Sequence, residues 1–248
     1  MVSQADLAEL KDFLVAYGGG YLRNTVWDSE YTCGYCTGIP SNPNFTTCYQ
    51  CGHEYRYSQE TSDLRGFVSY GWDNSQSATV MYGYKNEFAN RQAQRVVHGM
   101  LFYAIHEHRG CTTGSGSGEP TMWATVPSLR QRGHPQVLNA LAAGMLRNWS
   151  EARMAPSDDV RNPRSFRPEN FVAPPDVSGQ HVLLVDDTWA TGGHGESAAA
   201  ALKRAGAARV TLLVLARWLN MGRGRTDEFV KDELTADFDP DLCPFDRC

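Results

Sequence analysis

The sequence predicts an α/β fold with a mainly parallel central sheet, preceded by a small cysteine-rich module. Short apolar stretches typical of strands alternate with stretches whose apolar residues recur at helical spacing. One of the strand-like stretches, 182–185, is continuously apolar, as expected for a strand buried on both faces of a parallel sheet. Two C-x-x-C pairs precede this alternation. We therefore expect one sheet-based domain with a module added at its N-terminal side.

The first expected element is a helix near the N-terminus. Ser3 and Asp6 have the spacing of a capping box, and apolar residues follow at helical spacing up to position 14. The glycines at 18–20 should end this helix. The aromatic segment 67–84 is interrupted by turn-forming residues, which favours short strands or a hairpin.

The middle of the chain supplies the first helix–strand–helix alternation. Apolar residues within 93–104 fall at i, i+3, i+4, i+7, i+8 and i+11, which predicts an amphipathic helix. A flexible Gly/Ser connection at 114–118 precedes a predicted strand at 121–126, and a second helical pattern covers 137–149.

The alternation continues to the end of the predicted sheet. After the strand at 182–185, an alanine-rich helix is expected around 198–201, with its end at Gly206. A further strand is predicted at 210–215. This pattern completes the α/β assignment.

Four segments follow from this organisation. They are an N-terminal helix and linker (1–30), a zinc knuckle module (31–57), the sheet domain (67–225) and an acidic C-terminal tail (226–248). The net charge is −5, and the tail alone carries eight acids and two bases. The rest of the chain is close to neutral and does not repel phosphate ligands, whereas the tail is interpreted as a solvated surface.

Composition also bears on the compartment. No apolar run approaches the length of a membrane span, so we expect no membrane association. The first residues carry acids and lack the basic and apolar regions of a signal or transit peptide. A cytoplasmic location is the expectation.

The two C-x-x-C pairs predict a structural zinc site. Cys33 and Cys36 are separated by eleven residues from Cys48 and Cys51, and four thiolates can fill a tetrahedral Zn²⁺. His53 is an alternative ligand, although a surface position is the preferred interpretation. Free or redox-active thiols are the alternative to zinc.

The three other cysteines have no such pattern. Cys243 and Cys248 form a looser terminal pair that fits a second metal, a disulfide or neither. Cys111 lies near an apolar segment and is interpreted as a small buried residue.

An acidic pair followed by a glycine-rich turn predicts a site for a sugar phosphate. Asp186 and Asp187 come directly after the strand 182–185, where open α/β sheets bind their ligands. The turn 190–195 opens the following helix, whose N-terminal N–H groups and dipole attract a phosphate. The carboxylates would then face ribose hydroxyls or a metal ion. Trp189 could stack on a base or pack beneath the turn.

The order of motifs resembles the ComF family, in which a zinc knuckle precedes a domain of the type I phosphoribosyltransferase fold. The resemblance covers 33–217, and it is carried by the cysteine knuckle, the Met81–Asn86 and 126–136 segments, 161–171 and the acidic loop. The acidic loop itself resembles the loop that binds phosphoribosyl pyrophosphate (PRPP) in type I phosphoribosyltransferases.

This resemblance implies a complete PRPP site. Asp186 and Asp187 would be the catalytic carboxylates that contact the ribose hydroxyls, with Asp187 the candidate general base by position. The 5′-phosphate would be held by Ala190, Thr191, Gly192, Gly193, His194 and Gly195. His194 stands where the family usually has Thr or Ser, and its imidazole can also donate a hydrogen bond.

Other segments would hold the pyrophosphate and cover the sugar. A loop after an earlier strand, with nearby cations, would bind the pyrophosphate through Pro127, Ser128, Leu129, Arg130, Arg132 and Lys85. The arginine-bearing segment 151–175 is expected to be a long surface loop and resembles the family's mobile lid. An ordinary disordered connection is the alternative for that segment.

The implied function is a Mg²⁺-dependent phosphoribosyltransferase with a structural Zn²⁺. It would transfer the 5-phosphoribosyl group of PRPP to a nitrogen acceptor, a nucleobase or an amine, and release pyrophosphate. The alternative is a noncatalytic module of the same fold that senses PRPP or a nucleotide, or an adaptor in DNA uptake or processing. Nucleic acid is not indicated as a partner but stays open, as does a homo-oligomer.

Overall fold

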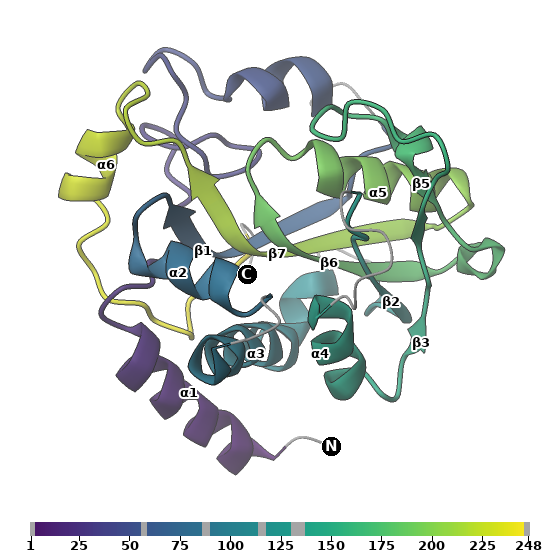
Figure 1. Cartoon of the computed structure of the whole chain (residues 1–248), viewed down its shortest axis with the longest axis horizontal. Coiled ribbons are helices and arrows are strands. Elements are labelled where there is room, and N and C mark those ends of the chain that lie inside the picture. Colours follow the sequence, from purple (N-terminus) through teal and green to yellow (C-terminus); the bar gives the residue numbers. More distant parts are fainter. Residues whose placement is uncertain (1–2, 56–58, 86–89, 114–117, 130–136, 246–248) are drawn as a thin grey trace.

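The computed structural model describes residues 3–55, 59–85, 90–113, 118–129 and 137–245. Its centre is a five-stranded sheet whose neighbouring strands are all parallel, which confirms the predicted α/β class (Figure 1). The strand order is β1 (Leu64–Trp72), β7 (Arg209–Leu219), β6 (His181–Trp189), β2 (Met122–Thr125) and β3 (Ser150–Glu151).

Helices cover both faces of this sheet (Figure 1). The helices α2 (Gln76–Gly83), α3 (Arg91–His106) and α4 (Val137–Met145) lie on one face, and α1 (Gln4–Gly18) packs outside α3. The cysteine module and α5 (Gly193–Arg204) cover the other face. Because strand side chains alternate between faces, Leu183 and Val185 join the core beneath α3, whereas Val182 and Leu184 join the core beneath α5.

Local signals at helix ends and along one helix face are confirmed. Ser3 caps α1 in a reciprocal capping box with Asp6, and the helix ends at the first of the three glycines. The predicted stripe lies within α3 and is buried. After α5, Gly206 adopts a φ of +100°, a conformation that favours glycine.

In the aromatic segment 67–84 the predicted strand is confirmed only up to Trp72, within β1; the rest forms the helix α2, so a hairpin was the wrong expectation. β1 pairs in parallel with the distant β7, and Ser75 caps α2 by accepting from the Ala78 N–H at 3.0 Å. The free edge of β1 is covered by segments from near both ends of the chain. The backbone N–H of Tyr70 donates to the Arg23 carbonyl, and that of Phe67 donates to the Pro244 carbonyl. That edge therefore needs no hairpin partner.

The segment 151–175 is organised as short elements, which corrects the expectation of a long loop. It contains β4 (Ala155–Pro156), paired antiparallel with β5 (Phe171–Val172), and the 3-10 turns η3 (Pro168–Asn170) and η4 (Pro175–Val177). The buried Asn170 side chain accepts from the Arg161 N–H at 2.9 Å and donates to the Arg161 carbonyl at 2.8 Å. This amide bridge holds the segment without a regular ladder.

The C-terminal ends of two strands and one helix differ from the predicted ends. β6 continues to Trp189 and β7 to Leu219, beyond the apolar runs that signalled them. α4 ends at Met145, so Trp149 packs beside that helix and is not part of it. The extension of β6 matters most, because it carries the acidic pair into the strand.

The acidic tail is docked on the body of the protein. It contains α6 (Thr226–Asp232), and Phe238 and Phe245 are buried in the same core as α3. Several of its acids, such as Asp237 and Asp239, stay exposed, as expected for a solvated surface. Within the part of the chain that the structure describes, no helix combines the length and apolarity that crossing a membrane would require.

The docked tail leads to a stability prediction. Phe238→Ala should lower the free energy of unfolding by about 3 kcal/mol, because it removes a buried aromatic side chain. Leu242→Ala, at a tail residue that is 56% exposed, is the matched control and should change it by no more than about 0.5 kcal/mol. Denaturant unfolding measures both, and equal effects would mean that the tail is not packed in solution.

Candidate functional site

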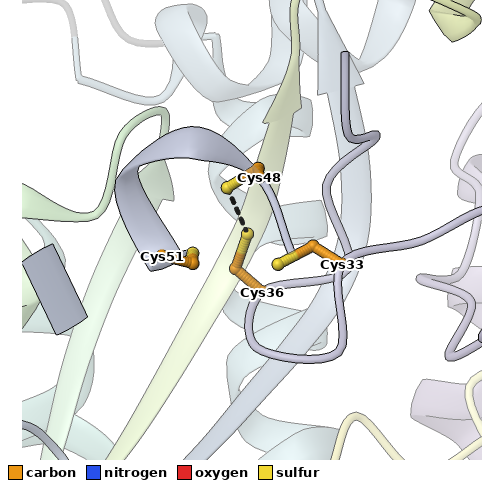
Figure 2. Close-up of side chains that lie close together, drawn as sticks. All are labelled: Cys33, Cys36, Cys48 and Cys51. Carbon is orange, nitrogen blue, oxygen red and sulfur yellow. Dashed lines mark hydrogen bonds between the residues drawn. The ribbon is translucent and has the colours of Figure 1, made fainter. Parts of the chain in front are cut away.

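The four predicted zinc ligands come together in one cluster (Figure 2). The sulfur atoms of Cys33, Cys36, Cys48 and Cys51 all lie within 4.8 Å of one another, and the Cys36–Cys48 separation is 3.7 Å. A tetrahedral ion with Zn–S bonds of about 2.3 Å has sulfur–sulfur edges of about 3.8 Å. The donor set and its spacing therefore fit a structural Zn²⁺. His53 is exposed and stacks on Tyr49, as the surface interpretation predicted.

Tight turns present these thiols. The Cys36 N–H donates to the Cys33 carbonyl at 3.2 Å, and the Tyr35 N–H donates to the Cys33 sulfur at 3.4 Å. In the second pair, Gly52 donates to the Cys48 carbonyl at 3.0 Å. The Tyr35 N–H would stabilise the Cys33 sulfur as a thiolate, and the two N–H to carbonyl bonds hold the turns that bring the sulfur atoms together.

A buried arginine connects the cysteine cluster to the acidic loop. Arg217, in β7, is 6% exposed and donates to the Cys36 carbonyl at 2.8 Å and to the Cys36 sulfur at 3.3 Å. The same guanidinium donates to the carbonyls of Trp189 and Ala190 at 3.2 and 3.3 Å. Its charge would offset part of the negative charge of four thiolates around a bound ion, and its donors fix the start of the glycine-rich turn.

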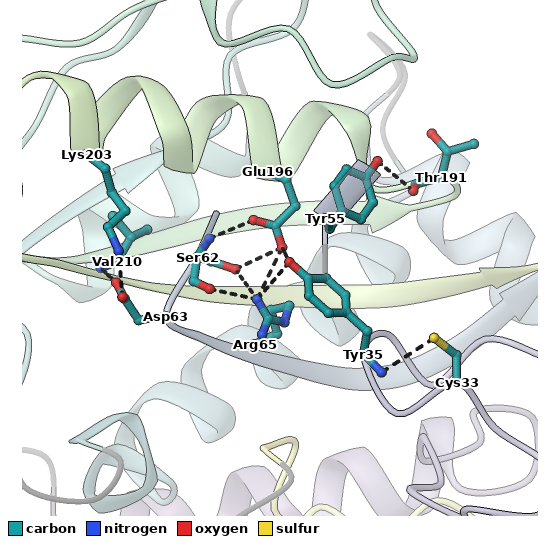
Figure 3. A network of polar contacts seen from close by, with 10 residues as sticks. All are labelled: Cys33, Tyr35, Tyr55, Ser62, Asp63, Arg65, Thr191, Glu196, Lys203 and Val210. Atoms are coloured by element: carbon teal, nitrogen blue, oxygen red, sulfur yellow. Dashed lines mark hydrogen bonds and ion pairs between the residues drawn. The ribbon is translucent and has the colours of Figure 1, made fainter. Parts of the chain in front are cut away.

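A buried carboxylate makes a second connection (Figure 3). Glu196, in the first turn of α5, is fully buried and accepts from the Ser62 N–H at 2.7 Å, the Ser62 hydroxyl at 2.9 Å and the Tyr35 hydroxyl at 2.9 Å. Arg65 lies 3.5 Å from it and stacks over the Tyr35 ring. This network joins the zinc module, the start of β1 and the start of α5.

The acidic pair points to opposite faces of the sheet. Asp186 is paired with Val214 within the β6–β7 ladder, and the ladder continues through Trp189. Side chains alternate along a strand, so consecutive acids must diverge. Asp186 lines a cavity beside Gly195, whereas Asp187 contacts residues that follow β1 in the chain.

Asp187 is bound by two neighbours at the end of α2. The Tyr84 hydroxyl donates to its Oδ2 at 2.5 Å, and Lys85 Nζ lies 2.5 Å from the same oxygen. Burial and the Asp187 charge raise the pKa of the Tyr84 phenol, which keeps it a donor. Lys85, predicted as a pyrophosphate ligand, is here the counter-ion of Asp187.

Asp186 is the carboxyl among the described residues that line the cavity. It is 7% exposed, and burial together with the charge of Asp187 raises its pKa to about 8. A carboxyl that changes charge near neutral pH inside a cavity is typical of functional sites. Its Oδ1 accepts from the Asp187 N–H at 2.9 Å.

The glycine-rich turn forms the wall of that cavity, whose volume is about 210 Å³. It is lined by Pro163, Arg164, Asp186, Thr188, Trp189, Ala190, Thr191, Gly192, His194 and Gly195. Gly192 has a φ of +90°, and a Cβ there would lie 2.2 Å from the Trp189 ring. Trp189 is 1% exposed and meets Phe67 edge-on at 5.3 Å, so it packs beneath the turn.

The segment predicted as a lid contacts the turn directly. The Arg164 carbonyl accepts from the Thr191 hydroxyl at 3.0 Å, and it lies so close to Gly193 that a Cβ there would be 2.2 Å away. The Arg167 N–H donates to the Ser197 hydroxyl at 2.7 Å. Gly193 therefore faces this segment, while the other turn residues line the cavity.

The predicted pyrophosphate loop lies at the same edge of the sheet. It follows β2, where the Val126 N–H donates to the Val185 carbonyl at 3.0 Å, directly beside the acidic pair. Pro127 and Leu129 are buried, and Ser128 is partly exposed. The predicted ligands Arg130 and Arg132 lie outside the described residues.

Sequence reasoning missed four residues that build this site: Tyr84, Arg164, Glu196 and Arg217. For two of these residues the sequence contained a feature that could have identified them. Glu196 is an acid beside an alanine-rich run, and Arg217 is a charge within the buried β7, and buried charges require partners. Arg164 belongs to the arginine-bearing segment predicted as a lid, and Tyr84 to the segment Met81–Asn86, but nothing local singles out either residue.

Comparisons with known proteins do not extend this description. No protein-family model and no curated protein matches the chain.

The role of Arg217 can be tested by a substitution that keeps its length. Arg217→Met should lower the free energy of unfolding by about 3 kcal/mol and weaken zinc binding, because thiolates and loop carbonyls lose a buried cationic donor. Denaturant unfolding and competition with a chromogenic chelator measure the two effects. Arg153→Met, at an exposed arginine, is the control. Unchanged zinc affinity in Arg217→Met would contradict the assignment.

The raised pKa of Asp186 predicts a pH dependence of stability. Between about pH 4 and pH 8 the folded chain keeps a proton that the unfolded chain has lost, so the free energy of unfolding falls as pH rises through this window. Asp186→Asn should match the wild type at pH 4 and exceed its melting temperature by about 2 °C or more at pH 9. Asp232→Asn, at an exposed acid, should follow the wild type. Parallel melting curves across pH for Asp186→Asn and wild type would refute the assignment.

Proposed function

We propose that this protein is a Mg²⁺-dependent phosphoribosyltransferase of the type I fold that transfers the 5-phosphoribosyl group of PRPP to a nitrogen acceptor. The observation that carries the proposal is the cavity between Asp186 and the glycine-rich turn at the start of α5. It combines a buried carboxyl with a helix N-terminus, which are complementary to ribose hydroxyls and to a phosphate. The resemblance of the motif order to the ComF family supports the same assignment.

The 5′-phosphate has a matching set of donors in the turn. By helix geometry, the N–H groups of Gly193 and Gly195 are not used by the hydrogen-bond ladder of α5, and the helix dipole adds a partial positive charge there. The Thr191 hydroxyl, which donates to the Arg164 carbonyl in the free protein, can turn to a phosphate oxygen. The turn is supported from below by Trp189 and Arg217, so its shape is preorganised.

The two acids would contact the ribose from different positions. Asp186 faces the cavity and can accept hydrogen bonds from ribose hydroxyls once its proton is lost. Asp187 is held by Tyr84 and Lys85, and displacement of Lys85 toward the pyrophosphate would free this carboxylate for the sugar. Bound Mg²⁺ would neutralise the pyrophosphate as it leaves, with carboxylate and phosphate oxygens as its ligands.

The reaction requires charge stabilisation more than covalent chemistry. The C1–O bond to pyrophosphate breaks with its electron pair on the leaving oxygen, and a nitrogen lone pair of the acceptor forms the new bond to C1. The acceptor's proton passes to a base or to water. The segment carrying Arg164 lies against the turn and would exclude water, which competes as a nucleophile.

A noncatalytic module that senses PRPP or a nucleotide, or an adaptor of this fold in DNA uptake or processing, is the second candidate. His194 favours this second candidate. At the chain position where the family usually has a phosphate-binding hydroxyl, this protein has an imidazole whose ring lies edge-on to Phe171 at 5.6 Å. Incubating protein, Mg²⁺ and PRPP with a panel of nucleobases and amines decides between the two. Pyrophosphate release with one acceptor supports the enzyme, and binding without release on any acceptor supports the sensor.

The site itself can be tested by calorimetry with PRPP and Mg²⁺. Asp186→Asn combined with Asp187→Asn should weaken binding about 100-fold or more, because at least two charge-assisted hydrogen bonds are lost. Asp232→Asn with Asp237→Asn replaces two carboxyls in the same way at exposed tail positions and should leave the affinity unchanged. Equal affinity in both double variants would move the site elsewhere.

A further inference from the structure

A second cluster of metal-binding side chains lies away from the sugar-phosphate site. The ligand atoms of His108, Cys111 and Cys243 all lie within 4.8 Å of one another. Cys111 and Cys243 pack against the core beneath α3, whereas the four-cysteine cluster belongs to the core on the other face of the sheet. The two clusters are therefore independent, and this one joins the end of α3 to the C-terminal tail.

The local backbone repeats the geometry of the four-cysteine cluster. The Cys111 N–H donates to the His108 carbonyl at 3.0 Å, as the Cys36 N–H does to the Cys33 carbonyl at 3.2 Å. The Phe245 N–H donates to the Cys243 sulfur at 3.4 Å, as a backbone N–H does to the Cys33 sulfur at the same distance. His108-x-x-Cys111 thus forms the same kind of turn as a C-x-x-C pair, and Cys243 has the same sulfur-directed donor.

The histidine is oriented as a metal ligand would be. His108 is 6% exposed, and its Nε2 lies 2.9 Å from the Pro240 carbonyl. A carbonyl only accepts, so Nε2 is the donor in this hydrogen bond, and Nδ1 is the ring nitrogen left to face a metal ion. A backbone carbonyl that fixes the second ring nitrogen is the usual support of a metal-bound histidine.

The oxidation state of Cys111 controls whether the cluster can bind. This residue is disulfide-bonded in the structure, which corrects its interpretation as a simple buried residue. Cys243 is a free thiol. Two molecules of a low-molecular-weight thiol would supply the two electrons and two protons that convert the disulfide to two thiols, and would become a disulfide themselves; a phosphine with one water does the same and becomes a phosphine oxide.

We infer that the reduced chain binds a thiophilic divalent ion of the zinc class through His108 Nδ1 and the sulfurs of Cys111 and Cys243. Binding displaces the protons of the two thiols, and the fourth coordination position is left to water or another donor. The ion fastens the tail to α3, where Tyr103 and Lys11 also contact Asp241. The inference does not depend on PRPP binding.

The test is the metal content of the full chain under reducing and oxidising conditions. Protein reduced with a phosphine, loaded with excess Zn²⁺ and desalted should contain two zinc ions per chain by elemental analysis, and oxidised protein one. Cys243→Ser and His108→Gln, reduced and loaded in the same way, should each contain one. His98→Gln, at a partly exposed histidine of α3 outside the cluster, should keep two.

The remaining zinc in each variant reports that the four-cysteine cluster, and with it the fold, is intact. Cobalt loaded into the second site of zinc-occupied protein should add visible absorption in the wild type and none in Cys243→Ser. One zinc per chain in the reduced wild type, or two in Cys243→Ser, would overturn the inference. PRPP enters neither measurement, so failure of the proposed enzymatic function would not affect the outcome.

Discussion

The buried guanidinium of Arg217 is the interaction on which the site depends. A charge removed from water must be matched by acceptors or by opposite charge. Here the acceptors are the Cys36 sulfur and carbonyl and the carbonyls of Trp189 and Ala190. Arg217 leaves so little space that a Cβ at Gly38 would lie 1.8 Å from its terminal nitrogen. Gly38 of the module and Arg217 of β7 are therefore in close contact, and a larger residue at position 38 would force them apart.

Glu196 supplies the complementary constraint from the helix side. It places a carboxylate in the first turn of α5, where the helix dipole favours negative charge, and uses it to bind Ser62 and Tyr35 (Figure 3). The zinc module is thus fastened to the sheet by Arg217 and to α5 by Glu196. Both contacts adjoin the glycine-rich turn, so the module acts as a support for the phosphate end of the cavity.

Strand periodicity explains why the acidic pair is asymmetric. Because β6 continues past Val185, Asp186 turns toward α5 and Asp187 toward α2. One carboxyl is buried beside a cavity with a raised pKa, and the other is neutralised by Lys85. Two adjacent residues of the same type therefore have different environments, and a ligand that uses both must displace Lys85.

The sequence by itself determined the α/β class, the order of most elements, the four-cysteine cluster and the position of the acidic loop. These features depend on local periodicity and spacing, which residues close in the chain express directly. Only the tertiary structure decided where β6 ends, that Tyr84 and Lys85 bind Asp187, and that Arg217 and Glu196 hold the module in place. It also brought His108 beside Cys243. Such contacts join residues roughly a hundred or more positions apart, and their partners are selected by packing and by the need to satisfy buried charge, which no local pattern encodes.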